Sequence, residues 1–458
     1  MLQGSLFLTM TKILFIIPGS GDSFYCGNCF RDHLQANALR KAGHEVIIMP
    51  LYLPFRYASF KADTPLFFPA TTFYVAGKFF NKGGMPKWIS GILESKPMLN
   101  IASSFSGTTS AAGLEDITLS MIHGNDVIFA EQVNAMIHWI EYHEKPDIIH
   151  LSTTLLIGIA KAVRQRINIP VVCSLQDEEV WIDSLEGAYL QEAWQGIADN
   201  IRYIDKFVTT SEFYKKTVSV RLPQIRDVEV IYPGVDISKY ASDLYPADPT
   251  IGFFYRMNRE NGLAILAEAF VQLKKRGKVK NLKLKIAGGY TTQDKPFLKG
   301  IRKLLRPFAN DVDWSHTYHP EHHPDFYKQI TLICVPVTFD EGVGLYLCEA
   351  FAAGRPAVEP DTGSFPEIIG SAGITYAPNN SDALADAVEQ LLTDTKWYER
   401  CRENALKLSQ TRYSDQVMAE RLAKVYETVT CGCLDSSFHT KQSGNSCAMS
   451  SGFSSKIP

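Results

Sequence analysis

The chain has 458 residues, 45% of them apolar and 21% charged. A single hydrophobic core rarely grows past about 250–300 residues, so this length favours two domains. The 46 basic and 49 acidic side chains give a net charge of -3. This balance lacks the basic excess that binding along a nucleic-acid backbone requires, so we expect no nucleic-acid partner.

The first half of the chain alternates short β-rich runs with helical patterns. The runs are continuously apolar, which predicts strands that are buried on both faces of a parallel sheet and joined by helices. They are KILFIIPG (12–19), HEVIIMPL (44–51), PDIIHL (146–151), IPVVCSL (169–175), DKFVTTS (205–211) and VEVIYPGVD (228–236). This pattern predicts a doubly wound, Rossmann-like α/β domain.

The same pattern starts again after a polar, proline-containing stretch near residue 245. Its runs are TIGFFYR (250–256), LKLKIAGG (282–289), VDWSH (312–316), TLICVPV (331–337), RPAVEP (355–360) and GITYA (373–377). We therefore expect an N-terminal domain of residues 1–245 and a second Rossmann-like domain of residues 246–411.

The C-terminal segment is predicted to be helical and then disordered. Helical patterns run from about residue 381 to 428, and we expect the helix at 412–430 to pack back on the first domain. Residues 431–458 are rich in Ser and Gly and have little to bury, which is typical of a disordered tail.

Cysteine usage and the apolar segments predict a cytoplasmic protein. The nine cysteines lack the spacing of a disulfide framework, which indicates reduced thiols. The apolar opening segment has no basic region and is interrupted by Lys12, so we expect no signal peptide. No run approaches the roughly 20 apolar residues that cross a bilayer, so any membrane contact is expected to be peripheral.

One segment in the first half of the chain is a candidate for peripheral contact with a membrane. Residues 73–96 interleave aromatic side chains with Lys78, Lys82 and Lys87. They could rest on an anionic membrane surface and bring the protein to a lipid-linked molecule. An insertion that packs on the core and leaves its lysines in solvent is the interpretation we favour.

A cluster of polar residues follows the fourth run of the second series. Glu341 and Glu349 lie eight positions apart, and Gly344 stands where the strand turns into a helix. Ligands bind at the carboxyl ends of strands in open parallel sheets, so this loop is a candidate site. The free amides of Gly344, Leu345 and Tyr346 would point at an anion such as a diphosphate. The carboxylates of Glu341 and Glu349 can accept hydrogen bonds from sugar or ribose hydroxyls.

This segment resembles the family 4 glycosyltransferases. The family's mark is a glutamate, seven residues and a second glutamate, followed by the Glu-Ala-hydrophobic-Ala-x-Gly-x-Pro run seen at 349–356. Other matching segments extend the resemblance over most of residues 12–425: GHEV (43–46), KPDIIH (145–150), TSEF (210–213), YPGVD (232–236) and GSFPEI (363–368). The resemblance implies a glycosyltransferase B-type fold, with two Rossmann-like domains that face each other across a cleft.

The resemblance also implies a function and roles for individual residues. A nucleotide-diphosphate sugar, UDP- or GDP-linked, would be the donor, and a sugar or lipid-linked hydroxyl the acceptor. Transfer would retain the anomeric configuration and need no metal or other cofactor. Glu349 would hold the ribose hydroxyls, Glu341 the donor sugar and Arg256 the diphosphate, whose oxygens its planar fork can bind in pairs. Gly19 and Gly21 would form a loop that faces the acceptor or the diphosphate.

One departure from the family pattern lies near the expected diphosphate. The family usually places a lysine five residues after the arginine, and this chain has Asn261 there. One phosphate-binding charge is therefore missing from the position. Candidate replacements on nearby loops are Arg259, Lys295 and Lys299.

A second departure lies after the run at 169–175. Many relatives carry His-Asp at this point, and this chain has Gln176 and Asp177, followed by Glu178 and Glu179. Gln176 can hydrogen-bond a hydroxyl, and any of the three carboxylates could orient or deprotonate an acceptor. The sequence leaves the choice among the three carboxylates open. We take Glu341, Gln176 and Asp177 as the catalytic candidates.

Two other functions stay open at this point. The missing lysine allows a catalytically silent, glycosyltransferase-like subunit that binds a nucleotide or sugar. A nucleotide-sugar epimerase on the same fold is a further alternative, although the spacing of the two glutamates favours transfer.

Overall fold

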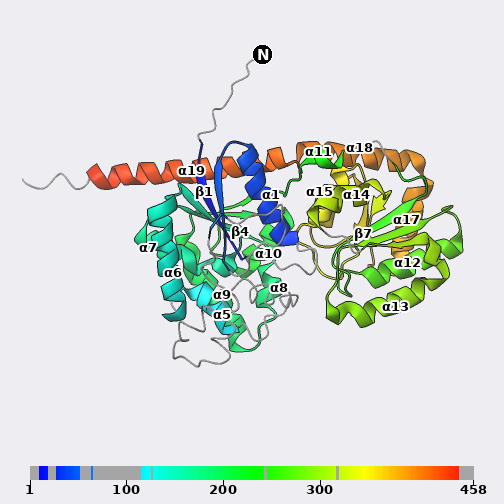
Figure 1. The fold of residues 1–458 in the computed structure, drawn as a ribbon, viewed down its shortest axis with the longest axis horizontal. Helices are drawn as coiled ribbons and strands as arrows, with labels where there is room; N and C mark the ends of the chain where they lie inside the picture. The colour runs from blue at the N-terminus through cyan, green and yellow to red at the C-terminus, as the bar shows by residue number, and fades with distance from the viewer. Residues whose placement is uncertain are drawn as a thin grey trace, which may run out of the picture.

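The computed structural model describes residues 10–18, 27–51, 63–64, 115–124, 127–241, 245–315 and 319–442. Within these ranges the chain forms two lobes, each built around a six-stranded parallel sheet flanked by helices (Figure 1). The predicted class of two doubly wound α/β domains is therefore confirmed. Gly19, Gly21 and the segment 73–96 lie outside the described residues.

The first lobe contains every strand predicted for the first half. Its elements are β1 (Lys12–Ile17), α1 (Gly27–Lys41), β2 (Glu45–Pro50), α5 (Glu115–His123), α6 (Val127–Trp139), β3 (Ile148–Leu151), α7 (Gly158–Arg166), β4 (Val171–Leu175), α8 (Glu178–Ile182), α9 (Ala188–Asn200), β5 (Lys206–Thr209), α10 (Glu212–Arg221) and β6 (Val228–Val230).

The second lobe and the C-terminal segment hold the remaining elements. These are α11 (Ile237–Tyr240), β7 (Thr250–Phe254), α12 (Leu263–Arg276), β8 (Lys283–Ala287), α13 (Lys295–Leu305), β9 (Val312–Trp314), α14 (His323–Lys328), β10 (Leu332–Ile333), α15 (Leu345–Ala352), β11 (Ala357–Pro360), α16 (Phe365–Ile369), β12 (Gly373–Tyr376), α17 (Ser381–Thr393), α18 (Thr395–Thr411) and α19 (Asp415–Gln442).

The strands of the first sheet are buried on both faces, which explains their continuous apolar runs. In β1, Leu14 and Ile16 belong to one hydrophobic cluster, while Ile13 and Phe15 belong to another on the opposite face. Side chains alternate between the faces of a strand, so both faces of this sheet must be covered by helices.

The strand order of each sheet fixes where a ligand can bind. The second sheet has the order β12-β11-β10-β7-β8-β9, and the order reverses between β7 and β10. The first sheet has the order β2-β1-β3-β4-β5-β6, and its reversal lies between β1 and β3. Ligands of doubly wound sheets bind beyond the carboxyl ends of the strands at such switch points.

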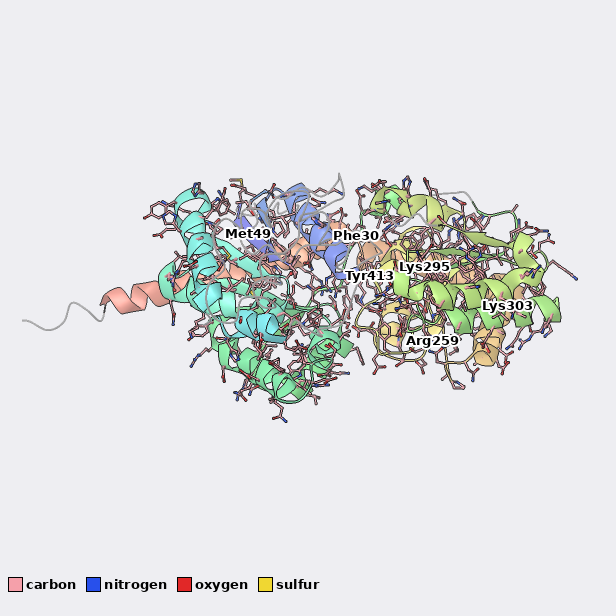
Figure 2. The ribbon with its side chains drawn as sticks, turned by 60° about the horizontal axis from the view of Figure 1, so that its bottom comes forward. Phe30, Met49, Arg259, Lys295, Lys303 and Tyr413 are labelled. Atoms are coloured by element: carbon pink, nitrogen blue, oxygen red, sulfur yellow. The ribbon has the colours of Figure 1, made fainter. Side chains whose placement is uncertain are left out.

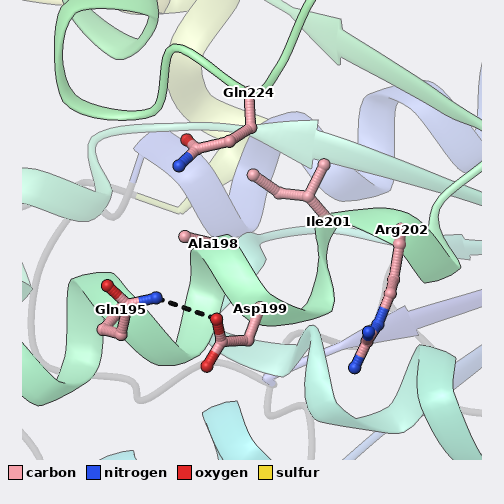
Figure 3. Close-up of a pocket in the computed structure, with 6 residues that line it drawn as sticks. All are labelled: Gln195, Ala198, Asp199, Ile201, Arg202 and Gln224. Atoms are coloured by element: carbon pink, nitrogen blue, oxygen red, sulfur yellow. Dashed lines mark hydrogen bonds between the residues drawn. The ribbon is translucent and has the colours of Figure 1, made fainter.

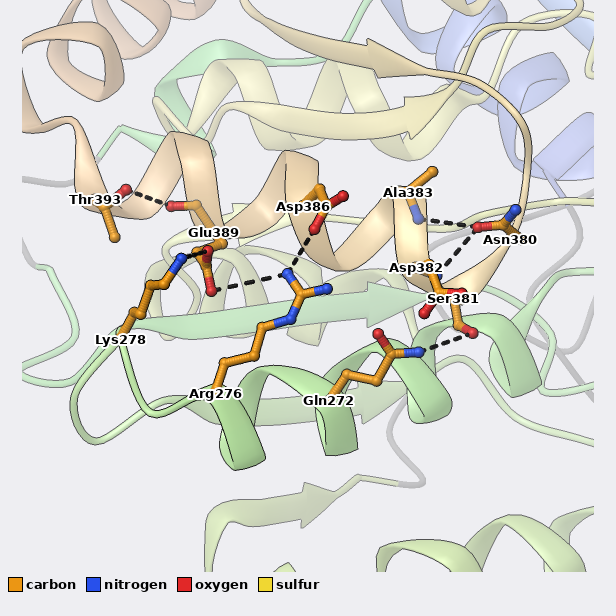
Figure 4. Close-up of polar contacts among 10 residues, drawn as sticks. All are labelled: Gln272, Arg276, Lys278, Asn380, Ser381, Asp382, Ala383, Asp386, Glu389 and Thr393. Atoms are coloured by element: carbon orange, nitrogen blue, oxygen red, sulfur yellow. Dashed lines mark hydrogen bonds and ion pairs between the residues drawn. The ribbon is translucent and has the colours of Figure 1, made fainter.

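Helices α12 and α17 lie side by side on one face of the second sheet. Arg276 of α12 pairs with Asp386 of α17 at 2.6 Å, and Gln272 donates to Ser381 at 3.2 Å (Figure 4). The Asn380 side chain caps the start of α17 by accepting from two backbone amides, which satisfies donors that a helix end leaves free. These polar contacts lie along the outer, solvent-facing side of the lobe.

The last described helix, α19, returns to the first lobe and packs on α1 (Figure 1). Met418, Leu422 and Tyr426 are buried in the cluster beneath α1. The Tyr426 hydroxyl lies 2.6 Å from His150 Nδ1 at the end of β3. The helix runs to Gln442, past residue 431 where a disordered tail was expected. Residues 443–458 lie outside the described part of the chain.

The two lobes are joined by backbone and carboxylate contacts. The Ser211 hydroxyl, at the start of α10, donates to the Gly342 carbonyl of the second lobe at 2.7 Å. The Glu367 carboxylate of α16 accepts from the amides of Glu212 and Phe213 at 2.8 and 3.0 Å. A negative charge is favourable at a helix N-terminus, so Glu367 holds α10 against the second lobe.

We predict that Glu367→Gln loosens this junction. The substitution removes the charge that two amide donors now share, and we expect a loss of about 2–4 kcal/mol in the free energy of unfolding. Urea denaturation and the radius of gyration in solution test this. The control is Glu403→Gln on the exposed face of α18. Equal behaviour of the two variants would contradict the role given to Glu367.

Candidate active site

The candidate site lies at the switch point of the second sheet. Tyr255 and Arg256 follow the carboxyl end of β7, and the loop from Cys334 to Gly344 follows β10 and leads into α15. Both loops therefore emerge at the edge where the strand order reverses. The predicted residues Arg256, Asn261, Glu341, Gly344 and Leu345 all belong to this edge.

Glu341 is held rigidly in its loop and is 5% exposed. Its carboxylate accepts from the Tyr255 hydroxyl at 3.2 Å and from the Val343 amide at 3.5 Å. Its backbone carbonyl accepts from the amide of Ser364 at 2.9 Å. The neighbouring Gly363 has a φ of 57°, and a Cβ atom there would lie 2.6 Å from the Glu341 nitrogen, so only glycine fits.

Asp177 of the first lobe meets this loop across the junction. A Cβ atom on Gly342 would lie 2.4 Å from Asp177 Oδ1, so the two loops are in direct contact. Burial and the negative charge of Asp177 raise the pKa of Glu341 to about 7. Burial also raises the pKa of the Asp177 carboxyl, while the Arg31 guanidinium opposes that rise. The structure thus brings together two residues that the sequence analysis selected as catalytic candidates.

The remaining carboxylates after β4 form a hydrogen-bonded network. Glu178 is buried and accepts from the Thr154 amide at 3.0 Å and from the Tyr214 hydroxyl at 2.8 Å. The Tyr214 hydroxyl also contacts Glu179, and burial raises the pKa of Glu179 to about 7. Glu178 is fully engaged in holding the loop, so Asp177 and Glu179 are the better candidates for proton transfer.

Gln176, the third catalytic candidate, lies in the same loop and is 7% exposed. Its side-chain amide donates to the Ser152 carbonyl, and its backbone amide donates to Glu178 at 2.7 Å. Its Oε1 atom has no hydrogen-bond partner among the described residues. That acceptor is available for a hydroxyl or an N–H group of a ligand.

Helix α15 begins at Leu345, as the sequence analysis expected. Gly344 is its N-cap residue in the left-handed conformation, with a φ of 61°. No side chain caps this end of the helix. The first amides of a helix have no partner within it, so those of Leu345 and Tyr346 are suited to an anion above the sheet.

Arg256 is 11% exposed and already has an anionic partner in this structure. Its Nη2 atom lies 3.3 Å from Asp294 Oδ2, which also accepts from the amide of Thr291. The guanidinium is thus fixed beside the carboxyl end of β7 by a loop that precedes α13. The long ion-pair distance is weak for an arginine–carboxylate contact, so a diphosphate could compete for the same fork.

Both amide groups of Asn261 donate within their own loop. The side-chain amide donates to the Arg256 carbonyl at 2.8 Å, and the backbone amide donates to Asn258 Oδ1 at 3.0 Å. Direct binding of the donor by Asn261 therefore stays a prediction. In this structure its side chain stabilises the backbone that carries Arg256.

The candidate replacement cations are on the surface. Arg259, Lys295 and Lys299 are exposed, and Arg259 packs over the Phe297 ring at 5.4 Å. Figure 2 shows Arg259 and Lys295 on the second lobe, with Phe30 at the junction of the two lobes. These side chains flank the site without being fixed in it.

Glu349, which is expected to hold the ribose hydroxyls, is bound by protein side chains in this structure. It is 0% exposed, and its Oε1 atom contacts the Tyr240 hydroxyl at 2.6 Å and His323 Nδ1 at 2.7 Å. The Tyr327 hydroxyl donates to Oε2 at 2.9 Å. A ribose could reach this carboxylate only after one of the three partners moved. In this structure Glu349 stabilises the packing of α11, α14 and α15.

Sequence reasoning also missed two buried ionisable groups near the site. Glu359 of β11 accepts from the Val335 amide at 3.0 Å, and burial raises its pKa well above the usual range. Its place inside an apolar strand run is a signal that the sequence contains. The second group is His323, whose ring lies edge-on to Phe254 with the centroids 4.6 Å apart. It stands beside His319 and His322 in the sequence, and nothing in that pattern indicates that His323 is buried.

No metal site accompanies these residues in the described part of the chain, where no three His, Cys, Asp or Glu side chains are grouped to hold an ion. The sequence does contain one Asp-x-Asp pattern, Asp311 and Asp313, next to the edge strand β9. Asp311 pairs with Lys274 at 2.8 Å, and Asp313 pairs with Lys285. Both carboxylates are thus neutralised by lysines.

A surface pocket on the first lobe is separate from the candidate site. It lies over the end of α9 (Figure 3). Its lining residues are Gln195, Ala198, Asp199, Ile201, Arg202 and Gln224. Gln195 donates to Asp199 at 2.8 Å, and none of the lining residues follows the carboxyl end of a strand.

Within the described residues, no helix has the length and apolar character that crossing a membrane requires.

Two family models match consecutive parts of this fold. Residues 120–239 match the model Glycosyltransferase Family 4, and residues 236–408 match Glycosyl transferases group 1. The first match lies on the lobe that carries Asp177, and the second covers the switch-point loops with Arg256 and Glu341.

Curated relatives match over parts of their length. The alpha-D-kanosaminyltransferase of Streptomyces kanamyceticus is 29% identical over 185 residues, which is 40% of this chain and 46% of the relative. The glycogen synthase of Mycobacterium tuberculosis is 25% identical over 294 residues, which is 62% of this chain and 69% of the relative. The chain is thus matched to less than half of the first relative's length.

Solved structures match over nearly the whole chain at low identity. Sucrose-phosphate synthase from Thermosynechococcus elongatus has a TM-score of 0.66 at 15% identity, covering 92% of this chain and 100% of that one. Anabaena HepE in complex with UDP has a TM-score of 0.61 at 16% identity, covering 91% and 100%. These neighbours define the fold as glycosyltransferase B-type. The two family models together span residues 120–408, so both lobes of this chain are similar to family 4 glycosyltransferases.

We predict that Glu341→Gln stabilises the protein above pH 7. The folded protein must keep a buried carboxylate charged there, since burial and Asp177 raise the pKa of Glu341 to about 7 from 4.5. As the pH falls from 7 to 4.5, folded Glu341 takes up its proton before the unfolded chain does, so the difference should shrink. Urea denaturation at pH 8 and pH 5 tests this. A pH-independent difference would rule out the raised pKa.

Proposed function

We propose that this chain transfers a sugar from a nucleotide-diphosphate donor to an acceptor hydroxyl, with retention of the anomeric configuration and without a metal. The observation that carries the proposal is the meeting of Asp177 and Glu341 where the carboxyl edges of the two sheets adjoin. A donor bound on the second lobe and an acceptor bound on the first would come together at this point. The proposal also draws on the complexes of HepE with UDP and UDP-glucose.

The second lobe has the groups that a diphosphate needs. Arg256 lies beside β7, and α15 directs its first amides to the same edge. A guanidinium and a helix N-terminus provide positive charge where phosphate oxygens would lie, which is the electrostatic work that a metal does in other enzymes. The buried Glu341 would then accept from a hydroxyl of the donor sugar.

The first lobe has candidate groups for the acceptor. Gln176 presents an unpaired Oε1 atom, and Asp177 and Glu179 have a raised pKa because they are buried. A carboxylate whose pKa is raised is better suited than an ordinary one to take a proton from an attacking hydroxyl at neutral pH. We assign Asp177 this task, because its loop touches the loop of Glu341.

A silent binding subunit is the second candidate, and Asn261 is the observation that favours it. Its side chain is committed to the Arg256 carbonyl, so the site holds one phosphate-binding charge fewer than the family pattern. Such a protein would bind a nucleotide yet form no product. Incubation of UDP-glucose with a panel of sugar and lipid-linked acceptors separates the two, since only the enzyme releases UDP in an acceptor-dependent way.

The same assay tests the finer parts of the proposal. Transfer should continue in excess EDTA, and proton NMR should show that the product keeps the anomeric configuration of the donor. Loss of activity with EDTA that magnesium or manganese restores would overturn the metal-free mechanism. Product with the opposite configuration would overturn retention.

We predict that the protein binds one nucleoside diphosphate well and that Arg256→Gln weakens it roughly 10–100-fold, the cost of losing a charge-assisted pair of hydrogen bonds. Calorimetric titration with UDP, GDP and ADP measures this and identifies the base. Arg306→Gln, on the exposed end of α13, is the control and should bind like the wild type. Equal binding by all three proteins would place the diphosphate elsewhere.

A further inference from the structure

Arg31 of α1 carries a buried guanidinium, two of whose nitrogens have no hydrogen-bonded partner among the described residues. The residue is 2% exposed, and its Nε and Nη2 atoms have no acceptor among the described residues. A buried charge is costly unless it is paired and hydrogen-bonded. Neither the donor site nor the packing of α1 described above makes use of this side chain, so its position requires another explanation.

The side chain lies at the carboxyl edge of the first sheet. Asn28 precedes it by one helical turn on the same face of α1, and the Asn28 amide reaches Asp177 Oδ2 at 3.4 Å. Phe30, between them, packs against His323 of the second lobe with ring centroids 5.1 Å apart. Arg31 is therefore carried by the part of α1 that lies over the lobe junction.

The effect of Arg31 on the pKa values of two neighbouring residues places its side chain near the ends of two strands. Burial and the Arg31 charge together lower the pKa of His150, at the end of β3, to about 3. The same guanidinium opposes the rise in the pKa of Asp177, directly after β4. Among the described residues its electrostatic influence falls on groups of the first lobe, whereas Arg256 lies on the second.

Two further polar atoms at this edge are buried and have no hydrogen-bond partner in the described part of the chain. They are Gln176 Oε1 and Ser152 Oγ, which follow β4 and β3 respectively. With the guanidinium they form a set of donors and one acceptor that is suited to a ligand with an anionic group and a hydroxyl. Asn28 and Asp177 close the side of this set toward the second lobe.

We propose that Arg31 binds an anionic group, a carboxylate or a phosphate, of the acceptor. This inference rests on the proposed function and adds the class of acceptor: a sugar that is itself acidic or phosphorylated. The fork of the guanidinium would hold the anion, and Gln176 would accept from a neighbouring hydroxyl. The attacking hydroxyl would then lie toward Asp177.

Anion binding can be tested without knowing the acceptor. Inorganic phosphate and acetate are titrated into the wild type, Arg31→Gln and the control Arg226→Gln, which changes an exposed arginine of the same lobe. We expect phosphate or acetate to bind to the wild type and the control, with at least a tenfold loss in Arg31→Gln. No binding to the wild type, or equal binding to all three, would overturn the proposal.

Binding of glucose 6-phosphate, glucuronate and glucose is then compared in the presence of UDP. The comparison shows whether the anion of the acceptor is a phosphate or a carboxylate. Tighter binding of either acidic sugar than of glucose supports the proposal and names the anion. Arg31→Gln should abolish that preference and leave UDP binding unchanged. If Arg31→Gln weakens UDP instead, Arg31 serves the diphosphate and the acceptor assignment is wrong. Absence of UDP binding to the wild type would count against the proposed function alone, since the anion titration needs no nucleotide.

A stability measurement separates ligand binding from a structural role. If Arg31 awaits a ligand, Arg31→Gln removes an unpaired buried charge and should raise the thermal midpoint. If Arg31 serves as the structural counter-charge of Asp177, the midpoint should fall. Phosphate should raise the midpoint of the wild type and leave that of Arg31→Gln unchanged.

Discussion

The structure depends on the contact between the loop after β10 and the loop after β4. Gly342 accepts a hydrogen bond from Ser211 and leaves no room for a side chain beside Asp177. This close approach removes water from Asp177 and Glu341, and the mutual repulsion of two carboxylates keeps a proton at this point near neutral pH. The chemistry that we assign to the site follows from that exclusion of water.

Because each lobe contributes its own switch point, the junction can combine two ligands that bind independently. The second lobe offers Arg256 and the start of α15, and the first offers Gln176 and Arg31. A transfer reaction needs both ligands in one place, because the acceptor hydroxyl must lie beside the sugar carbon that forms the new bond as the bond to the diphosphate breaks. Helix α19 fixes the first lobe by packing under α1, which carries Arg31 to the junction.

The fold could be predicted from the sequence to a large extent. The twelve strands in the described part of the chain coincide with the predicted runs, because parallel strands buried on both faces are mostly apolar. The start of α15 at Leu345 also follows from local residues. The surroundings of Glu349 could not be predicted, since Tyr240, His323 and Tyr327 reach it from segments that only the tertiary structure brings together. The absence of a lysine at position 261 was visible in the sequence. The hydrogen bond from the Asn261 side chain to the Arg256 carbonyl was not, because it depends on the geometry of the loop.

The central claim is that the switch-point edge of the second sheet binds the nucleotide of the donor. Hydrogen–deuterium exchange with and without UDP, read by mass spectrometry, tests it most directly. The account predicts slower exchange in peptides that cover residues 255–262 and 338–346, with the outer helices α12 and α17 unchanged. Protection confined to the first lobe, or none at a UDP concentration that saturates the calorimetric signal, would contradict it.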